Sequence, residues 1–175
     1  MVNTQRIKFI DTYIDNLTAS EAKECVNEVI RKPGYHYVVT PNADIIVKMH
    51  QDRELKDICE KADLILTDGQ IVVKLSRRYG TAIKERVCMT DFVWDVFDLA
   101  IEKEYKIFLL GGKEEILSKA TENVKKKLPK LNIVDSYSPP FGFEKDKKAL
   151  AETNERIRNS HADILIVFLG CPKQE

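Results

Sequence analysis

Polar residues follow two apolar, strand-like runs of this sequence, and their types suit the binding and activation of a hydroxyl group. Asp68 comes between Thr67 and Gly69, directly after the run DLIL. A carboxylate there either caps a following helix or acts as a general base that takes a proton from a substrate. Thr40 and Asn42 follow the run YHYVV. Asn42 is a natural helix N-cap, yet a hydroxyl and an amide are also the groups that bind the hydroxyls of a sugar.

Two further strand-like runs end in residues that suit a phosphorylated ligand. Gly111 and Gly112 follow KIFLL and precede a helical pattern, so their backbone could approach a diphosphate at a helix N-terminus. They fit neither GxGxxG nor GxxxxGK[ST], which weakens both the dinucleotide and the P-loop interpretations. Lys173 and Gln174 follow DILIVFL and offer a cation and an amide, with a solvated tail as the alternative.

The elements that must position these residues alternate between strand and helix along the chain. Strand-like runs cover residues 6–10, 35–40, 63–67, 106–112, 132–137 and 163–170. Helical periodicity covers residues 20–32, 43–62, 69–79, 90–105, 113–128 and 147–161. Runs such as LILT and ILIVFL are apolar on both faces, which is typical of parallel strands covered by helices. We therefore predict an α/β fold with an open, mostly parallel, Rossmann-like sheet and helices on both faces, whose ligands bind beyond the carboxyl ends of the strands.

Composition excludes several classes of protein. At 175 residues and 43% hydrophobic content, the chain is expected to form a single globular domain over residues 1–175. The 28 basic residues balance the 28 acidic ones, so no nucleic-acid partner is predicted, although residues 74–86 are locally basic. No apolar run approaches the ~20 residues of a spanning helix, and no signal peptide is visible, so we expect a cytoplasmic protein.

Metal and hydrolase signatures are missing from the sequence. The three histidines have no ligand spacing, and the four cysteines form no CxxC pair. No paired Asp-x-Asp and no Gly-x-Ser-x-Gly elbow is present. We therefore predict no metal site and no cofactor.

Six motifs together resemble the WecG/TagA/CpsF glycosyltransferase family. They are Thr-Pro-Asn at 40–42, ADLILTDG at 62–69, ERV with Thr-Asp at 85–91, LLGG at 109–112, PPFGF at 139–143 and LGCPKQE at 169–175. As an ordered set they are far more specific than any one of them, and the likeness runs from about Arg6 to the last residue. The sequence is most similar to the TagA-type N-acetylmannosaminyltransferases of wall teichoic acid synthesis.

The resemblance implies an inverting transfer of N-acetylmannosamine from UDP-N-acetylmannosamine to undecaprenyl-diphosphate-linked N-acetylglucosamine, forming a β-1,4 bond. Asp68 matches the family's proposed base and Thr40 lies beside it. Arg86 and Gln174 match substrate contacts. We add Asn42, Gly111 and Gly112 as substrate-binding residues from their positions at strand ends. Metal-independent catalysis would require fixed cations such as Arg86 and helix N-termini to meet the charge of the leaving diphosphate.

The family resemblance also implies partners. Relatives continue past PKQE into a C-terminal appendage that supplies further basic residues and a membrane surface, so we expect this chain to be truncated before that segment. The resemblance suggests a homodimer or homotrimer that is peripheral on the inner face of the plasma membrane. The sequence departs at Cys88 and Met89, where relatives often carry small residues.

Three alternatives stay open. A member of the same family could use another UDP-sugar donor. A non-catalytic nucleotide-sugar-binding module could use the same pocket if Asp68 were only a helix cap. A dinucleotide-dependent oxidoreductase is disfavoured by the missing glycine fingerprint.

Overall fold

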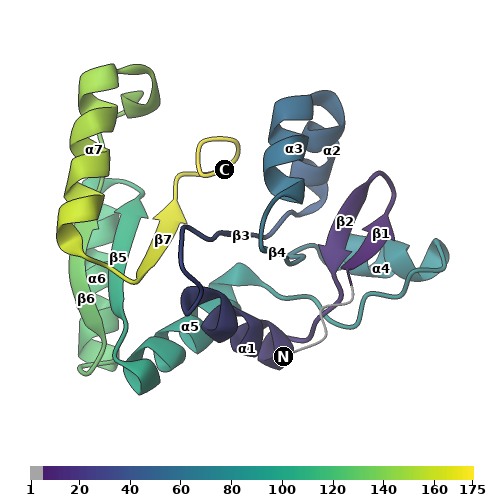
Figure 1. Ribbon diagram of the computed structural model, residues 1–175, viewed down its shortest axis with the longest axis horizontal. Coiled ribbons are helices and arrows are strands. Elements are labelled where there is room, and N and C mark those ends of the chain that lie inside the picture. The colour runs from purple at the N-terminus through teal and green to yellow at the C-terminus, as the bar shows by residue number, and fades with distance from the viewer. Residues whose placement is uncertain (1–5) are drawn as a thin grey trace. The chain divides into compact units, whose positions relative to one another are not determined.

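The computed structural model describes residues 6–175 and shows an α/β protein with open sheets (Figure 1). The described chain divides into two compact units, one with the residues up to Val96 together with Glu175, and one comprising Phe97–Gln174. The predicted α/β class and the parallel pairing of strands are confirmed. The strands form three separate sheets among the described residues, where the sequence predicted one.

The first unit holds short strands surrounded by helices. Its elements are β1 (Arg6–Phe9), β2 (Thr12–Asp15), α1 (Ala19–Ile30), β3 (Val38–Val39), α2 (Ala43–Gln51), α3 (Arg53–Glu60), β4 (Leu64–Ile65), α4 (Gln70–Arg78) and the start of α5 (Met89–Lys103). β3 and β4 pair in parallel, with Val38 opposite Leu64 and Val39 opposite Ile65. One core cluster of this unit joins the hairpin to the helices through Phe9, Ile14, Ile46, Val72, Val73 and Ile83.

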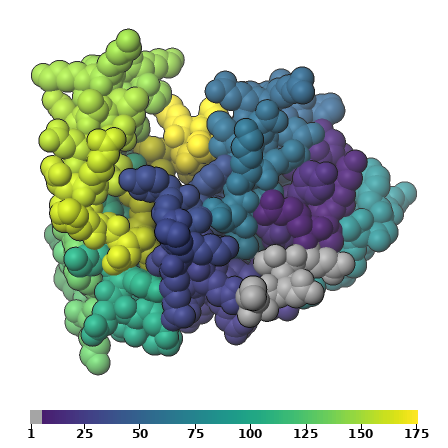
Figure 2. All heavy atoms as spheres, viewed as in Figure 1, coloured from purple at the N-terminus to yellow at the C-terminus, as the bar shows by residue number. Residues whose placement is uncertain are grey.

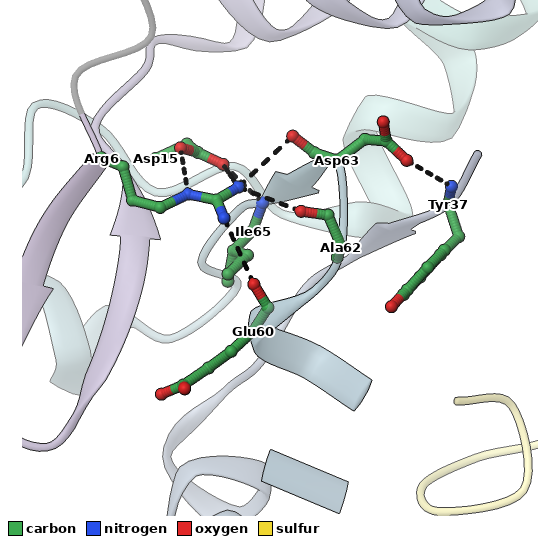
Figure 3. Close-up of polar contacts among 7 residues, drawn as sticks. All are labelled: Arg6, Asp15, Tyr37, Glu60, Ala62, Asp63 and Ile65. Atoms are coloured by element: carbon green, nitrogen blue, oxygen red, sulfur yellow. Dashed lines mark hydrogen bonds and ion pairs between the residues drawn. The ribbon is translucent and has the colours of Figure 1, made fainter. Parts of the chain in front are cut away.

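An antiparallel hairpin of β1 and β2 begins the described chain, and the sequence analysis missed its second strand. Arg6 on β1 donates from Nε and Nη2 to the two carboxylate oxygens of Asp15 on β2, at 2.9 and 2.8 Å. The same Asp15 carboxylate accepts the amide of Ile65 in β4 at 2.8 Å, so one ion pair links three strands (Figure 3). This hairpin therefore supports the strand that leads to Asp68.

The helix predicted over residues 43–62 is two helices. Asp52 ends α2 in an extended conformation, and its carboxylate accepts the amides of Glu54 and Leu55 to begin α3. An Asp side chain that bonds to nearby amides offers the backbone an alternative to continuing a helix. The apolar periodicity runs through the break, which explains why the sequence predicted one helix.

The second unit holds a three-stranded parallel sheet in the order β6-β5-β7. Its elements are the remainder of α5, then β5 (Lys106–Gly111), α6 (Glu114–Lys127), β6 (Asn132–Tyr137), the 3-10 turn η1 (Phe143–Lys145), α7 (Lys147–Ser160) and β7 (Ile164–Phe168). The central strand β5 is buried from Ile107 to Gly111, as its unbroken apolar sequence predicted. All three strands therefore end at the same edge of this sheet.

Candidate active site

The seven residues predicted to form the site fall into two groups, four in the first unit and three in the second. Each group is described within its own unit. All of them except Arg86 follow the carboxyl ends of parallel strands, as predicted, and Arg86 lies on the loop between two helices.

Buried Thr67 forms hydrogen bonds that link the strand ends of the first unit. Its hydroxyl donates to the carbonyl of Pro41 at 3.3 Å, which brings the segment after β3 next to the segment after β4. Its carbonyl accepts the amide of Val87 at 3.0 Å, which brings in the segment that contains Arg86. The structure thus places the segments of Thr40, Asp68 and Arg86 side by side around one residue.

Asp68 does not cap the helix that follows it. Helix α4 begins after Gly69, which is the N-cap and makes no side-chain bond to the helix. A Cβ at Gly69 would lie 2.6 Å from Cγ2 of Val72, so a larger residue there would require the Val72 side chain to shift. Within the first unit, residues 6–96, the partly buried carboxylate of Asp68 makes no hydrogen bond or ion pair and is available to a ligand.

Arg86 lies on an exposed loop between α4 and α5, next to a residue that is anchored in the core. Val87 beside it is buried and bonded to Thr67. Arg86 itself has a loose ion pair, 3.8 Å from Nη2 to a carboxylate oxygen of exposed Asp91. Such an exposed ion pair contributes little to stability, so the guanidinium can exchange Asp91 for a phosphate.

Asn42 is the N-cap of α2. Its Oδ1 accepts the amide of Ile45 at 3.0 Å, so the capping interpretation of this residue is confirmed. Its side-chain nitrogen remains a donor of two hydrogen bonds at the mouth of the site. Capping and substrate binding by Asn42 are therefore compatible.

Asn42→Ala is expected to lower the free energy of unfolding by about 1 kcal/mol, because it removes the cap of α2. Asn42→Asp keeps an acceptor in the same place, so its stability should stay within about 0.5 kcal/mol of the wild type. It loses the amide donor, and we expect weaker substrate binding from it. Urea denaturation and the KM of both variants check this. Wild-type KM in Asn42→Asp would leave Asn42 with a capping role alone.

The glycine turn of the second unit connects β5 to α6. Gly111 has φ +109°, and a Cβ there would lie 2.8 Å from the backbone of Phe168 in β7, so only glycine fits. Gly112 has φ +75° with open space where its Cβ would be, and its amide donates to the carbonyl of Phe168 at 3.1 Å. Lys113 is the N-cap of α6 and makes no side-chain bond to it. The turn therefore leaves backbone amides of the helix start open to an anion.

Gln174 lies in the turn that follows β7. Its Oε1 accepts the amide of Gly170 at 3.1 Å, and the amide of Lys173 donates to the Gly170 carbonyl at 2.9 Å. Because Gly112 bonds to Phe168, this turn and the glycine turn lie at the ends of neighbouring strands. Figure 2 shows the yellow end of the chain at the surface.

Three residues that matter to the geometry were not selected from the sequence as site residues. Thr67 was noted only as the residue before Asp68, while its role depends on which segments pack around it. Asp15 lies in the strand that the sequence analysis missed. Glu144 follows the PPFGF motif and pairs with Lys173 at 3.0 Å. Only Glu144 had a signal in the sequence, because it directly follows that glycine-containing loop.

Two classes of feature are missing from the part of the chain that the structure describes. Within residues 6–175, no group of three or more His, Cys, Asp or Glu side chains is arranged to hold a metal ion. No helix in the same range combines the length and apolar character needed to cross a membrane.

Parallel strands with a glycine turn and polar strand ends define an α/β protein of the Rossmann-like class. The model of the Glycosyl transferase WecG/TagA/CpsF family matches residues 7–175, and the chain belongs to this family.

Two curated relatives have the same name, N-acetylglucosaminyldiphosphoundecaprenol N-acetyl-beta-D-mannosaminyltransferase. The protein from Bacillus spizizenii (strain ATCC 23059 / NRRL B-14472 / W23) is 30% identical over 139 residues, which cover 79% of this chain and 52% of the relative. The protein from Bacillus subtilis (strain 168) is 28% identical over 138 residues, with the same shares covered. The chain thus spans about half the length of the curated relatives it matches.

Proposed function

We propose that this chain belongs to an inverting glycosyltransferase that moves N-acetylmannosamine from UDP-N-acetylmannosamine to undecaprenyl-diphosphate-linked N-acetylglucosamine, forming a β-1,4 bond. The observation that supports this most directly is the carboxylate of Asp68, which stands at a parallel strand end without serving as a helix cap. The names of the two Bacillus relatives support the same donor sugar and acceptor.

The proposed reaction needs one base and one in-line displacement. The acceptor hydroxyl gives its proton to Asp68 while its oxygen attacks the anomeric carbon. The bond from that carbon to the UDP oxygen breaks, and UDP leaves with the electron pair. Thr40 lies on the neighbouring strand end and is proposed to orient the acceptor hydroxyl.

The charge that develops on the leaving diphosphate must be balanced by fixed positive groups. We assign this role to Arg86, whose only ion pair among residues 6–175 is the loose one to Asp91. Gly111, Gly112 and Gln174 are further proposed contacts for the substrate. We also propose that the reaction needs no metal ion, and that the whole protein works as a homo-oligomer at the membrane surface.

A donor comparison tests the function. Purified protein is given a soluble analogue of the lipid-linked acceptor and UDP-N-acetylmannosamine, UDP-N-acetylglucosamine or UDP-glucose, each with and without EDTA. We expect transfer from UDP-N-acetylmannosamine at the same rate with and without chelator. Transfer from another donor alone would reassign the sugar within the family. Activity that EDTA abolishes and Mg²⁺ or Mn²⁺ restores would contradict metal independence.

A further inference from the structure

Helix α4 has a row of exposed apolar side chains along one side. Ile71, Leu75 and the C-cap residue Tyr79 follow one another at intervals of four residues, so they line up along the helix. Their exposed fractions are 62%, 38% and 65%, whereas Val72 and Val73 are buried in the core of the first unit. Single exposed apolar residues are common, but a continuous row of them on one helix marks an interaction surface. These three residues are called the apolar row below.

Three cations lie next to the apolar row. Lys74, Arg77 and Arg78 are exposed, and within the described part of the chain their side chains form no ion pair. Residues 69–83 contain no aspartate or glutamate that could balance their charge locally. The whole chain has as many acidic as basic residues, so this cationic triplet makes α4 a local positive surface. Figure 2 shows the teal α4 at the surface, next to the purple hairpin of β1 and β2.

Apolar, aromatic and basic side chains on one helix match the chemistry of an anionic lipid bilayer. Helices that lie in a membrane interface bury aliphatic and aromatic residues at the headgroup level and place Lys and Arg against lipid phosphates. Tyrosine suits this layer because its ring is apolar and its hydroxyl is polar. A contact between two copies of α4 would instead bring both cationic triplets together without an acidic residue on the helix, so charge favours the bilayer.

The same helix connects this surface to the candidate active site. Asp68 directly precedes Gly69, the N-cap of α4. The nine residues of the helix span about 13 Å at the usual rise per residue. A bilayer that contacts α4 is therefore about one helix length or less from Asp68 along the helix axis. The diphosphate of a lipid-linked acceptor lies at the level of the headgroups, so this contact would hold Asp68 near the acceptor.

We propose that α4 docks this protein onto an anionic lipid bilayer. The apolar row inserts among the headgroups, and the cationic triplet pairs with lipid phosphates. This surface is distinct from the C-terminal appendage that the family resemblance implies, because it is formed by a helix of the first unit. It rests on the proposed function in one respect, namely that the acceptor to be reached is lipid-linked.

Vesicle sedimentation tests the charge part of the proposal without any transfer reaction. Purified protein is mixed with vesicles of equal parts phosphatidylglycerol and phosphatidylcholine, or of phosphatidylcholine alone. We expect binding to the anionic vesicles to be about a hundredfold stronger, because each of three cations near a charged surface contributes roughly a factor of five. Replacing the cationic triplet with glutamine should remove that difference. The matched control replaces Lys125, Lys126 and Lys127 at the end of α6, and it should bind like the wild type.

Ile71→Ser tests the apolar row. It should bind anionic vesicles about tenfold more weakly, because less apolar surface is buried among the lipids. Ile116→Ser on α6 is the matched control, since Ile116 is 61% exposed, and its binding should not change. Both side chains are largely exposed, so thermal unfolding of both variants should match the wild type.

Tryptophan fluorescence tests insertion directly. In Tyr79→Trp the new indole should shift its emission to shorter wavelength when anionic vesicles are added, after the wild-type signal of Trp94 is subtracted. Tyr35→Trp replaces a fully exposed tyrosine outside α4, and its emission should not shift. An unchanged emission of Tyr79→Trp on bound vesicles would contradict insertion of the apolar row.

Other results would also overturn the docking surface. Wild-type binding of anionic vesicles by both the glutamine triple variant and Ile71→Ser would show that lipids bind elsewhere. Sedimentation velocity detects the remaining occupant, a second copy of the chain. If Ile71→Ser converts a dimer into a monomer and leaves vesicle binding unchanged, the apolar row is an interface between copies and the proposal is wrong.

The docking surface and the transferase can fail separately. Vesicle binding through α4 by a protein that transfers no sugar would support the surface and contradict the proposed function. Transfer to a soluble acceptor analogue by a protein that binds no vesicles would support the function and overturn the surface. If both hold, Ile71→Ser should keep the wild-type rate with the soluble analogue and lose rate with a lipid-linked acceptor embedded in anionic vesicles.

Discussion

Asp68→Asn is expected to lower kcat for transfer by about 10²- to 10⁴-fold, the usual contribution of a general base. The amide is nearly the same size as the carboxylate but cannot take the proton of the acceptor hydroxyl. KM for the UDP-sugar should change little, because the proton is exchanged with the acceptor. Initial rates with UDP-N-acetylmannosamine and a soluble acceptor analogue measure both constants.

Folding should not change in this variant. Helix α4 is capped by Gly69 without a side-chain bond, so Asn at position 68 removes no structural contact there. The midpoint of thermal unfolding should therefore stay at the wild-type value. A lower kcat with an unchanged unfolding midpoint would distinguish Asp68 from an aspartate with a structural role, whose replacement would lower both the stability and the rate.

Asp44→Asn is a matched control for the Asp68 variant. Asp44 also follows a parallel strand end, but it lies in the first turn of α2 and pairs with Lys48 at 2.7 Å on the surface. Its replacement should leave kcat unchanged. Full activity in Asp68→Asn would rule out Asp68 as the base and would revive the interpretation of this chain as a non-catalytic nucleotide-sugar-binding module.

Local sequence signals predicted those elements whose structure depends on nearby residues. Thr18 and Glu21 have the spacing of a capping box, and both of its hydrogen bonds are present at the start of α1. The unbroken apolar run of β5 predicted a central parallel strand, and the strand lies between β6 and β7. Long helices with clear periodicity, such as α6 and α7, were found within a few residues of their ends.

Elements defined by distant contacts were harder to predict. β2 is only four residues, TYID, and it forms a strand because it pairs with β1 and because Asp15 bonds to β4. Asp52 stops a helix whose apolar periodicity continues past it. Neither effect produces a regular pattern in the sequence.

The strand-end positions of several candidate residues were predicted, but their local contacts were not. Strand ends marked Thr40, Asp68 and Gly111 correctly as residues at the carboxyl edges of parallel strands. Sequence alone left the role of Asp68 open between a cap and a free carboxylate. That choice depends on where α4 begins, and in the structure Gly69 rather than Asp68 is its N-cap.

The ion pair of Arg6 and Asp15 connects the β1–β2 hairpin to β4, the strand that leads to Asp68. Only 2% of the Asp15 side chain is exposed, and its carboxylate accepts two bonds from Arg6 and one from the Ile65 amide. Arg6 also donates to the carbonyls of Glu60, Ala62 and Asp63, which lead into β4 (Figure 3). The hydrogen bond to Asp15 raises the pKa of Arg6 above its ordinary value, so the guanidinium stays protonated.

Arg6→Ala should lower the free energy of unfolding by about 3–5 kcal/mol, because it leaves the buried carboxylate of Asp15 without its counter-charge. Arg6→Lys should lower the free energy of unfolding by only part of that amount, since an ammonium group keeps the charge but not the bidentate hydrogen bonding. Lys48→Ala, which removes an exposed pair of the same unit, should cost less than about 1 kcal/mol. Urea denaturation followed by circular dichroism measures all three.

Because the Ile65 amide bonded to Asp15 lies three residues before Asp68, kcat should fall together with stability in Arg6→Ala. A loss below about 1 kcal/mol in Arg6→Ala would show that the hairpin does not hold β4 in place.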